Sequence, residues 1–169
     1  MHAPRFFLLL TLLFAGIAPA FSAVPADGAP SAAAKSRARF STRFYTMVWN
    51  APDRLDYRFD AARGELVLAV EQFGRGNESA RLDLRVKADK PGRHPIPANG
   101  AAAFRVIGCD NTVGGSSWVQ ITRVDAARIE GQFELHGHCA KMPSNSETLR
   151  NGSFSLPFDA PVDVGRKKR

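Results

Sequence analysis

The chain has 169 residues, a formal net charge of +7, two cysteines and 44% hydrophobic residues. This length suits one domain with a single hydrophobic core. Residues 44–165 hold 14 basic and 15 acidic side chains, so the excess positive charge lies outside the expected domain. A nucleic-acid-binding domain would need a basic surface of its own, and we therefore expect no nucleic-acid partner.

The first residues have the layout of a secretory signal peptide. Arg5 is followed by an apolar run of 13 residues, Phe6–Ala18, and then by Pro19 and small residues. A membrane-spanning helix needs about 20 apolar residues, and this run is shorter. We expect a signal peptide over residues 1–22 and a periplasmic or secreted protein without a transmembrane helix. No cysteine lies near the expected cleavage site, which argues against a lipid anchor.

Two further segments have the composition of unfolded chain. Residues 23–39 are rich in Ala, Pro and Ser and bury too little surface to offset their ordering entropy, so we expect a flexible linker. Residues 161–169 are expected to be a basic disordered tail. Its basic residues are Arg166, Lys167, Lys168 and Arg169. The basic ends could make weak electrostatic contact with an anionic membrane surface, or they could remain solvated and keep the protein soluble.

Apolar and polar residues alternate repeatedly between these two segments. The alternating stretches are 54–60, 66–70, 81–87, 119–122 and 132–136. A period of two residues is typical of strands that bury one face. The pattern predicts an all-β domain over residues 40–160, folded as an antiparallel β-sandwich or flattened barrel of about eight short strands.

Glycine-containing pairs separate the predicted strands, and they predict turns at Gly114–Gly115 and Asn151–Gly152, among others. The pattern Arg-x-Asp-Ala-Ala-Arg-x-Glu occurs twice, at 58–65 and 123–130. Each copy lies between two predicted strands, and an Asp can accept hydrogen bonds from the backbone of the turn that follows it. We expect two hairpins with the same turn chemistry, or alternatively a duplicated half-domain.

The two cysteines, Cys109 and Cys139, are predicted to form a disulfide, because an even pair in an oxidising compartment is usually bridged. Both lie at predicted strand ends, each followed by an expected loop, so the bridge requires these ends to be neighbours. The alternative is a metal site. His136 and His138 would point to the same side of a strand, and two imidazoles on one face can bind copper or zinc.

A familiar pattern occurs in the second half of the chain. Residues 119–125, 131–133 and 151–157 read V-x-I-T-x-x-D, G-x-F and N-G-S-F-x-x-P. Over residues 118–158 the chain resembles exported bacterial β-sandwich proteins of unknown function. The resemblance implies a β-sandwich and a bacterial source. It implies no catalytic residues, because the matching positions are turn and core residues.

No motif of a nucleophilic hydrolase, a zinc protease or a phosphate-binding loop occurs in the sequence, and we expect no cofactor and no catalytic residues. Large aromatic side chains that are exposed would mark a binding surface. The candidates are Trp118, Trp49 and Tyr45.

These observations favour an exported, non-catalytic binding or accessory protein of the bacterial envelope. Its partner would be an envelope protein or a cell-surface ligand, and an inhibitor or immunity-type protein belongs to the same class. The alternative is a small periplasmic hydrolase whose site is built from scattered His, Asp and Ser residues.

Overall fold

The computed structural model describes residues 30–44, 47–74 and 79–159, and the expected signal peptide (1–22) and basic tail (161–169) lie outside these ranges. One short helix and ten strands occupy the described residues. Their bounds are α1 (Ala32–Arg37), β1 (Arg39–Phe44), β2 (Met47–Trp49), β3 (Arg54–Asp60), β4 (Glu65–Gln72), β5 (Ala80–Lys87), β6 (Gly92–Pro95), β7 (Gly100–Val106), β8 (Cys109–Val124), β9 (Arg128–Cys139) and β10 (Met142–Pro157). No helix in these ranges is long and apolar enough to cross a membrane.

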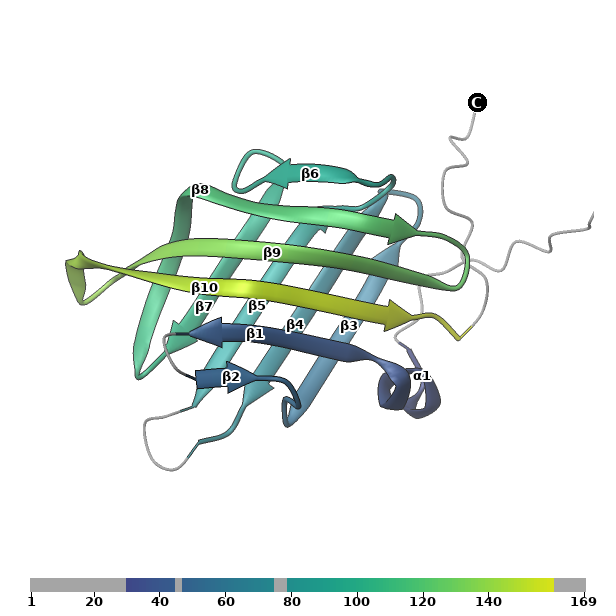
Figure 1. The fold of residues 1–169 in the computed structure, drawn as a ribbon. Helices are drawn as coiled ribbons and strands as arrows, with labels where there is room; N and C mark the ends of the chain where they lie inside the picture. The colour runs from purple at the N-terminus through teal and green to yellow at the C-terminus, as the bar shows by residue number, and fades with distance from the viewer. Residues whose placement is uncertain (1–29, 45–46, 75–78, 160–169) are drawn as a thin grey trace, which may run out of the picture.

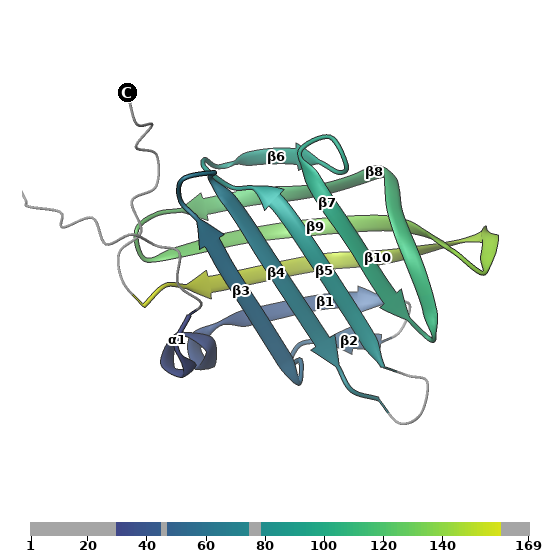
Figure 2. The same cartoon turned by 180° about the vertical axis from the view of Figure 1, so that it is seen from behind.

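All the strands belong to one curled antiparallel sheet with the order β2-β1-β10-β9-β8-β7-β5-β4-β3, and β6 pairs with β8. The curl places β3, β4, β5 and β7 across the other strands, so that two layers face each other (Figures 1 and 2). We call β3, β4, β5 and β7 the short-strand layer, and β1, β2, β6, β9, β10 and the second half of β8 the long-strand layer. The prediction of an all-β antiparallel sandwich or flattened barrel is confirmed.

The strands differ in number and length from the expected eight short ones. The two additional strands, β2 and β6, have three and four residues. In contrast, β8 and β10 have 16 residues each, and they run through segments that the sequence predicted as turns or loops. Gly114–Gly115 lies inside β8 and Asn151–Gly152 lies inside β10. Both glycine-containing pairs therefore lie at register shifts within strands rather than in turns.

Strand β8 connects the two layers. Its first residues pair with β7, and its later residues, Trp118 to Ile121, pair with β6. Along β9 the register jumps between Gly114, opposite His136, and Trp118, opposite Glu134. Three residues, 115–117, therefore face a single residue of β9, and Gly115 has a φ of +64°. A bulge of this kind bends a strand from one layer into the next.

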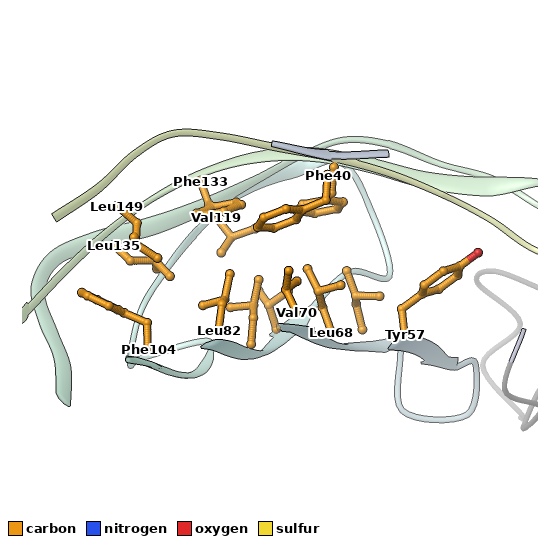
Figure 3. Packing of buried hydrophobic residues seen from close by; sticks show 14 of the residues in the cluster. Phe40, Tyr57, Leu68, Val70, Leu82, Phe104, Val119, Phe133, Leu135 and Leu149 are labelled. Carbon is orange, nitrogen blue, oxygen red and sulfur yellow. The ribbon is translucent and has the colours of Figure 1, made fainter. Parts of the chain in front are cut away.

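The core lies between the two layers. Figure 3 shows side chains of the long-strand layer, such as Phe133 and Val119, facing Leu82 and Val70 of the short-strand layer. The rings of Phe40 and Phe133 stack with centroids 5.8 Å apart. The period-two pattern put these residues on the inner face, because successive side chains of a strand point to opposite sides.

Phenylalanine rings fill the space above three glycines of the long-strand layer. Phe133 lies over its cross-strand partner Gly152, and Phe154 lies over Gly131. Phe104 of the short-strand layer lies over Gly137, where a Cβ would come within 2.9 Å of the ring. Glycine in a strand weakens it unless a neighbouring aromatic ring covers the gap, so these pairs act as packing units.

The C-terminal part of the expected linker is ordered. We expected residues 23–39 to be a flexible linker, whereas 32–37 form α1 and Arg39 begins β1. The small side chain of Ala34 allows the helix to approach closely and is completely buried. Lys35 forms an ion pair with Asp56 of β3, so α1 bridges the open side of the sandwich.

A buried hydrogen bond also ties the layers together at this side. The hydroxyl of Tyr57, on β3, donates to the carbonyl of Pro157, on β10, at 2.6 Å. Burial raises the pKa of Tyr57 to about 12, so the hydroxyl stays protonated and able to donate at neutral pH.

The repeated Asp-led pattern forms two hairpin turns, as predicted. Asp60 Oδ1 accepts the backbone N–H of Arg63 at 2.9 Å between β3 and β4. Asp125 Oδ1 accepts the backbone N–H of Ala127 at 2.8 Å and of Arg128 at 3.0 Å between β8 and β9. The two turns use the same Asp-to-backbone chemistry.

A disulfide joins Cys109, the first residue of β8, to Cys139, the last residue of β9, with 5.7 Å between the Cα atoms. The predicted neighbourhood of these two strand ends is confirmed, because Cys139 pairs directly with Asn111. The segment after Cys109 is part of β8 rather than the expected loop. The bridge closes a sequence separation of 30 residues.

Replacing both cysteines with Ser should lower the free energy of unfolding by about 2–4 kcal/mol, because the unfolded chain then regains its loop entropy. Urea denaturation measures this loss, and reduction of the unmodified protein should produce a similar one. Two reactive thiols in the denatured, unreduced protein would contradict the disulfide.

Gly152→Ala should destabilise the protein by about 1–3 kcal/mol, because its methyl group would overlap the confined ring of Phe133. The matched control is Gly114→Ala, since no heavy atom lies within 4 Å of a Cβ built there. We expect its urea midpoint to stay close to that of the unmodified chain. Equal losses for the two variants would contradict the packing role of Phe133.

Candidate functional site

The outer faces of the two layers differ in how their polar side chains are used. On the short-strand layer, acidic and basic residues form a network of ion pairs, and we call this surface the charged face. Its ion-paired residues are Arg54, Asp56, Asp60, Arg63, Glu65, Glu71, Arg81, Asp83 and Arg85. Hydrogen bonds from Lys35 and Arg54 hold the pKa of Asp56 below its usual value. Each carboxylate in this network has a basic partner.

A hollow of about 410 Å³ lies on the charged face over β3, β4 and β5. Its wall carries Glu71, which pairs with Arg54 at 3.7 Å and with Arg81 at 3.5 Å. Exposed ion pairs of this kind contribute little stability individually. They also occupy the groups that a charged ligand would need.

The long-strand layer carries two adjoining hollows on its outer face, of about 230 and 400 Å³. The first is lined by Trp118, Gln132, Phe133, Glu134, Asn151, Gly152 and Ser153. The second is lined by Arg39, Phe40, Ser41, Asn50, Thr122, Glu130, Gly131, Gln132, Ser153, Phe154 and Ser155. Gln132 and Ser153 belong to both, and we call the combined depression the outer groove.

Two bulges shape the first hollow from opposite sides of β9. On β8, residues 115–117 oppose the single residue Leu135. On β10 the register shifts between Leu149, opposite Leu135, and Gly152, opposite Phe133, and Asn151 takes a positive φ of 51°. Bulges often lie beside functional sites because they redirect side chains. Here they leave Trp118 and Asn151 on either side of Glu134.

A hydroxyl group holds the first of these bulges in place. Ser117 is almost completely buried, and its Oγ accepts the backbone N–H of His136 at 2.8 Å. The same hydroxyl donates to the carbonyl of Gly114 at 2.7 Å. The position of Trp118, the next residue, is therefore fixed from inside the sheet.

The polar side chains of the outer groove are mostly free. The side chains of Gln132, Ser153, Ser41 and Asn50 make no hydrogen bond within the described part of the chain. Amide and hydroxyl groups both donate and accept hydrogen bonds. The outer groove can therefore exchange hydrogen bonds with a polar ligand without breaking internal ones.

The three aromatic residues singled out in the sequence have different positions. Trp118 is half-buried, lines the first hollow and has the Arg93 guanidinium 4.3 Å from its ring centroid. Trp49 is buried in the core with 4% exposure, so it does not contribute to an exposed surface. Tyr45 lies outside the described residues.

His136 contacts both a carboxylate and a hydroxyl beside the outer groove. Its Nε2 lies 3.0 Å from Oε1 of Glu134, two residues earlier on the same strand. Its Nδ1 lies 3.2 Å from Oγ1 of Thr148, the residue opposite it on β10. An acid, an imidazole and a hydroxyl in this order can activate the hydroxyl as a nucleophile. The sequence search missed this set because Thr148 becomes a neighbour only through strand pairing.

His136 and His138 were also the alternative metal ligands. Both side chains lie on the outer side of β9 as predicted, but His136 is bonded to Glu134 and Thr148. No group of three or more His, Cys, Asp or Glu side chains in the described ranges is arranged to hold a metal ion. The described residues therefore offer a polar binding groove and a Glu–His–Thr set, in adjoining positions.

Comparisons of this chain with protein-family models, with curated proteins and with solved structures found no match. The resemblance over residues 118–158 therefore stays a prediction.

Proposed function

We propose that this chain is an exported, non-catalytic binding or accessory protein of the bacterial envelope, and that it holds its ligand in the outer groove. The observation that carries the proposal is the set of free amide and hydroxyl side chains around Gln132 and Ser153, next to the half-buried Trp118. Ligand sites commonly combine an aromatic surface with a few polar groups of fixed orientation.

Export is supported by two observations. The N-terminal sequence has the layout of a signal peptide, and the Cys109–Cys139 disulfide is of a kind that persists in oxidising compartments. The resemblance to exported bacterial β-sandwich proteins adds the expectation of a bacterial envelope. The ligand belongs to the envelope or the cell surface, and an inhibitor or immunity-type role falls within the same class.

The rigidity of the strands that carry the groove favours a binding role over an enzyme that depends on mobile loops. Gln132 and Ser153, at the centre of the groove, lie on β9 and β10, which are paired on both sides, and Ser117 fixes the bulge before Trp118. The backbone of paired strands is already ordered and loses little further entropy on binding, which favours affinity. The groove is thus preorganised for a ligand that lies across the strands.

We expect the mature protein to co-sediment with the envelope fraction of its own cells, and Ser153→Trp to abolish this by filling the shared wall of the two hollows. Retention should persist at about 0.5 M salt, where contacts through the basic ends are screened. Quantitative immunoblotting of pellet and supernatant measures the bound fraction.

The matched control is Ala69→Trp, which fills the hollow on the charged face instead. This variant should be retained like the unmodified protein. Retention that survives Ser153→Trp but disappears in Ala69→Trp would move the binding site to the charged face. Circular dichroism and thermal melting must show that both variants are folded.

The Glu134–His136–Thr148 set favours a second candidate function, a small hydrolase. In that reaction His136 would take the Thr148 proton through Nδ1 while the hydroxyl attacks an acyl carbon, and Glu134 would orient the imidazole. The imidazolium would return this proton to the leaving group as its bond to the acyl carbon breaks, and water would then hydrolyse the Thr148 ester. We rank it second because neither His136 nor Thr148 is among the residues that line the two hollows of the outer groove or the hollow on the charged face.

We expect the protein to hydrolyse p-nitrophenyl acetate no faster than its Thr148→Val variant, which keeps the side-chain shape and removes the hydroxyl. His136→Gln provides a second comparison, because it keeps a polar side chain without an imidazole. Release of p-nitrophenolate at neutral pH is the measurement. A loss of about 10²-fold or more in both variants would instead establish the hydrolase.

A further inference from the structure

We infer that the ligand of the outer groove is an uncharged glycan chain, which lies across strands β8, β9, β10 and β1. This inference rests on the proposed function and narrows it to one chemical class. It follows from the hydrogen-bonding groups, the charges, the aromatic side chain and the length of the groove.

The hydrogen-bonding groups of the groove match sugar hydroxyls. Gln132, Asn50 and Asn151 each offer amide donors and an acceptor, and Ser41 and Ser153 offer hydroxyls. A sugar hydroxyl likewise donates and accepts, so both kinds of group can be satisfied at once. An anion would use only the donors. An extended peptide would need an unpaired strand edge, whereas Gln132 and Ser153, at the centre of the groove, lie on β9 and β10, which are paired on both sides.

The charged groups in the lining already have partners. Glu130 accepts hydrogen bonds from Arg128 and from Ser155, both at 3.1 Å. Glu134 lies 3.0 Å from the His136 ring. The Arg39 side chain donates to the carbonyls of Ser36 and Ala38. A cationic ligand would have to take Glu130 and Glu134 from their partners, whereas an uncharged ligand leaves these contacts intact.

Trp118 supplies a flat apolar surface at the β8 end of the groove. Pyranose rings carry C–H groups on their faces, and these pack against indole rings while the hydroxyls point sideways to polar groups. The Arg93 guanidinium covers one face of the indole and holds the ring in place, so a sugar would pack against the part of the indole that lines the first hollow. The combination of one aromatic surface and surrounding amides suits a sugar ring better than a lipid chain.

The groove is longer than one sugar. It runs over four neighbouring strands from Trp118 on β8 to Ser41 on β1. Three strand spacings of about 4.8 Å span roughly 14 Å. The two hollows in series, with Gln132 and Ser153 between them, therefore fit a short oligosaccharide stretch within a longer chain.

Titration with defined hexasaccharides tests the inference on the mature protein. The uncharged probes are chitohexaose, cellohexaose and maltohexaose, and hexagalacturonate is the anionic probe. At least one uncharged probe should bind at millimolar concentration or below and change the tryptophan fluorescence. Trp49 is buried in the core, so the change should come from Trp118.

Trp118→Ala and Gln132→Ala should each weaken that binding by about tenfold or more, which corresponds to the loss of roughly 1.4 kcal/mol. The matched controls are Phe73→Ala, an exposed aromatic outside the groove, and Gln72→Ala, a glutamine bonded to Asp53. Both controls should bind like the unmodified protein in isothermal titration calorimetry.

Three results would overturn the glycan inference: no binding of any uncharged probe, binding of hexagalacturonate alone, or loss of envelope retention after protease treatment of the envelope. Each leaves the proposed function standing, because Ser153→Trp can still abolish retention. If Ser153→Trp leaves retention unchanged, the proposed function fails together with this inference.

Discussion

The bulge of β8 at residues 115–117 is the constraint on which both the fold and the site depend. It turns the strand from the short-strand layer into the long-strand layer, so the core between the layers closes around it. The buried Ser117 hydroxyl satisfies backbone groups of both β8 and β9 at this point. A buried backbone group left unpaired here would be costly. The same geometry fixes Trp118 at the wall of the outer groove.

The remaining features of the scaffold keep β8 in register with β9. The disulfide joins the first residue of β8 to the last residue of β9. The Asp125 carboxylate holds the turn at the other end of the same strand pair. With both ends fixed, β8 must accommodate three extra residues between them, two at the bulge 115–117 and one at the register shift between Ile121 and Arg123. A slip of the register would expose core side chains. The fixed ends therefore require the extra residues to bulge, and the hydrogen bonds of Ser117 hold the larger bulge where it is.

The sequence predicted the features that depend on local patterns. Alternation identified the strands, and the cysteines identified two neighbouring strand ends. The glycine pairs were misassigned because turns and bulges favour the same residues, and only the strand pairing of Gly152 with Phe133 distinguishes them. The sequence predicted a flexible linker where α1 forms, because this helix is stabilised by the tertiary burial of Ala34 rather than by a local pattern.

The outer groove was predictable only in part, for a related reason. Trp118 attracted attention as a large aromatic, but Gln132 and Ser153 look like ordinary outward-facing strand residues, as Arg81 and Asp83 do. Side-chain contacts distinguish the two groups. Arg81 and Asp83 form an ion pair at 2.7 Å, whereas the side chains of Gln132 and Ser153 have no partner within the described residues. Solvent-facing side chains without partners add little to folding stability. Folding alone therefore does not account for the concentration of free amides and hydroxyls beside Trp118, whereas the proposed binding of a polar ligand would.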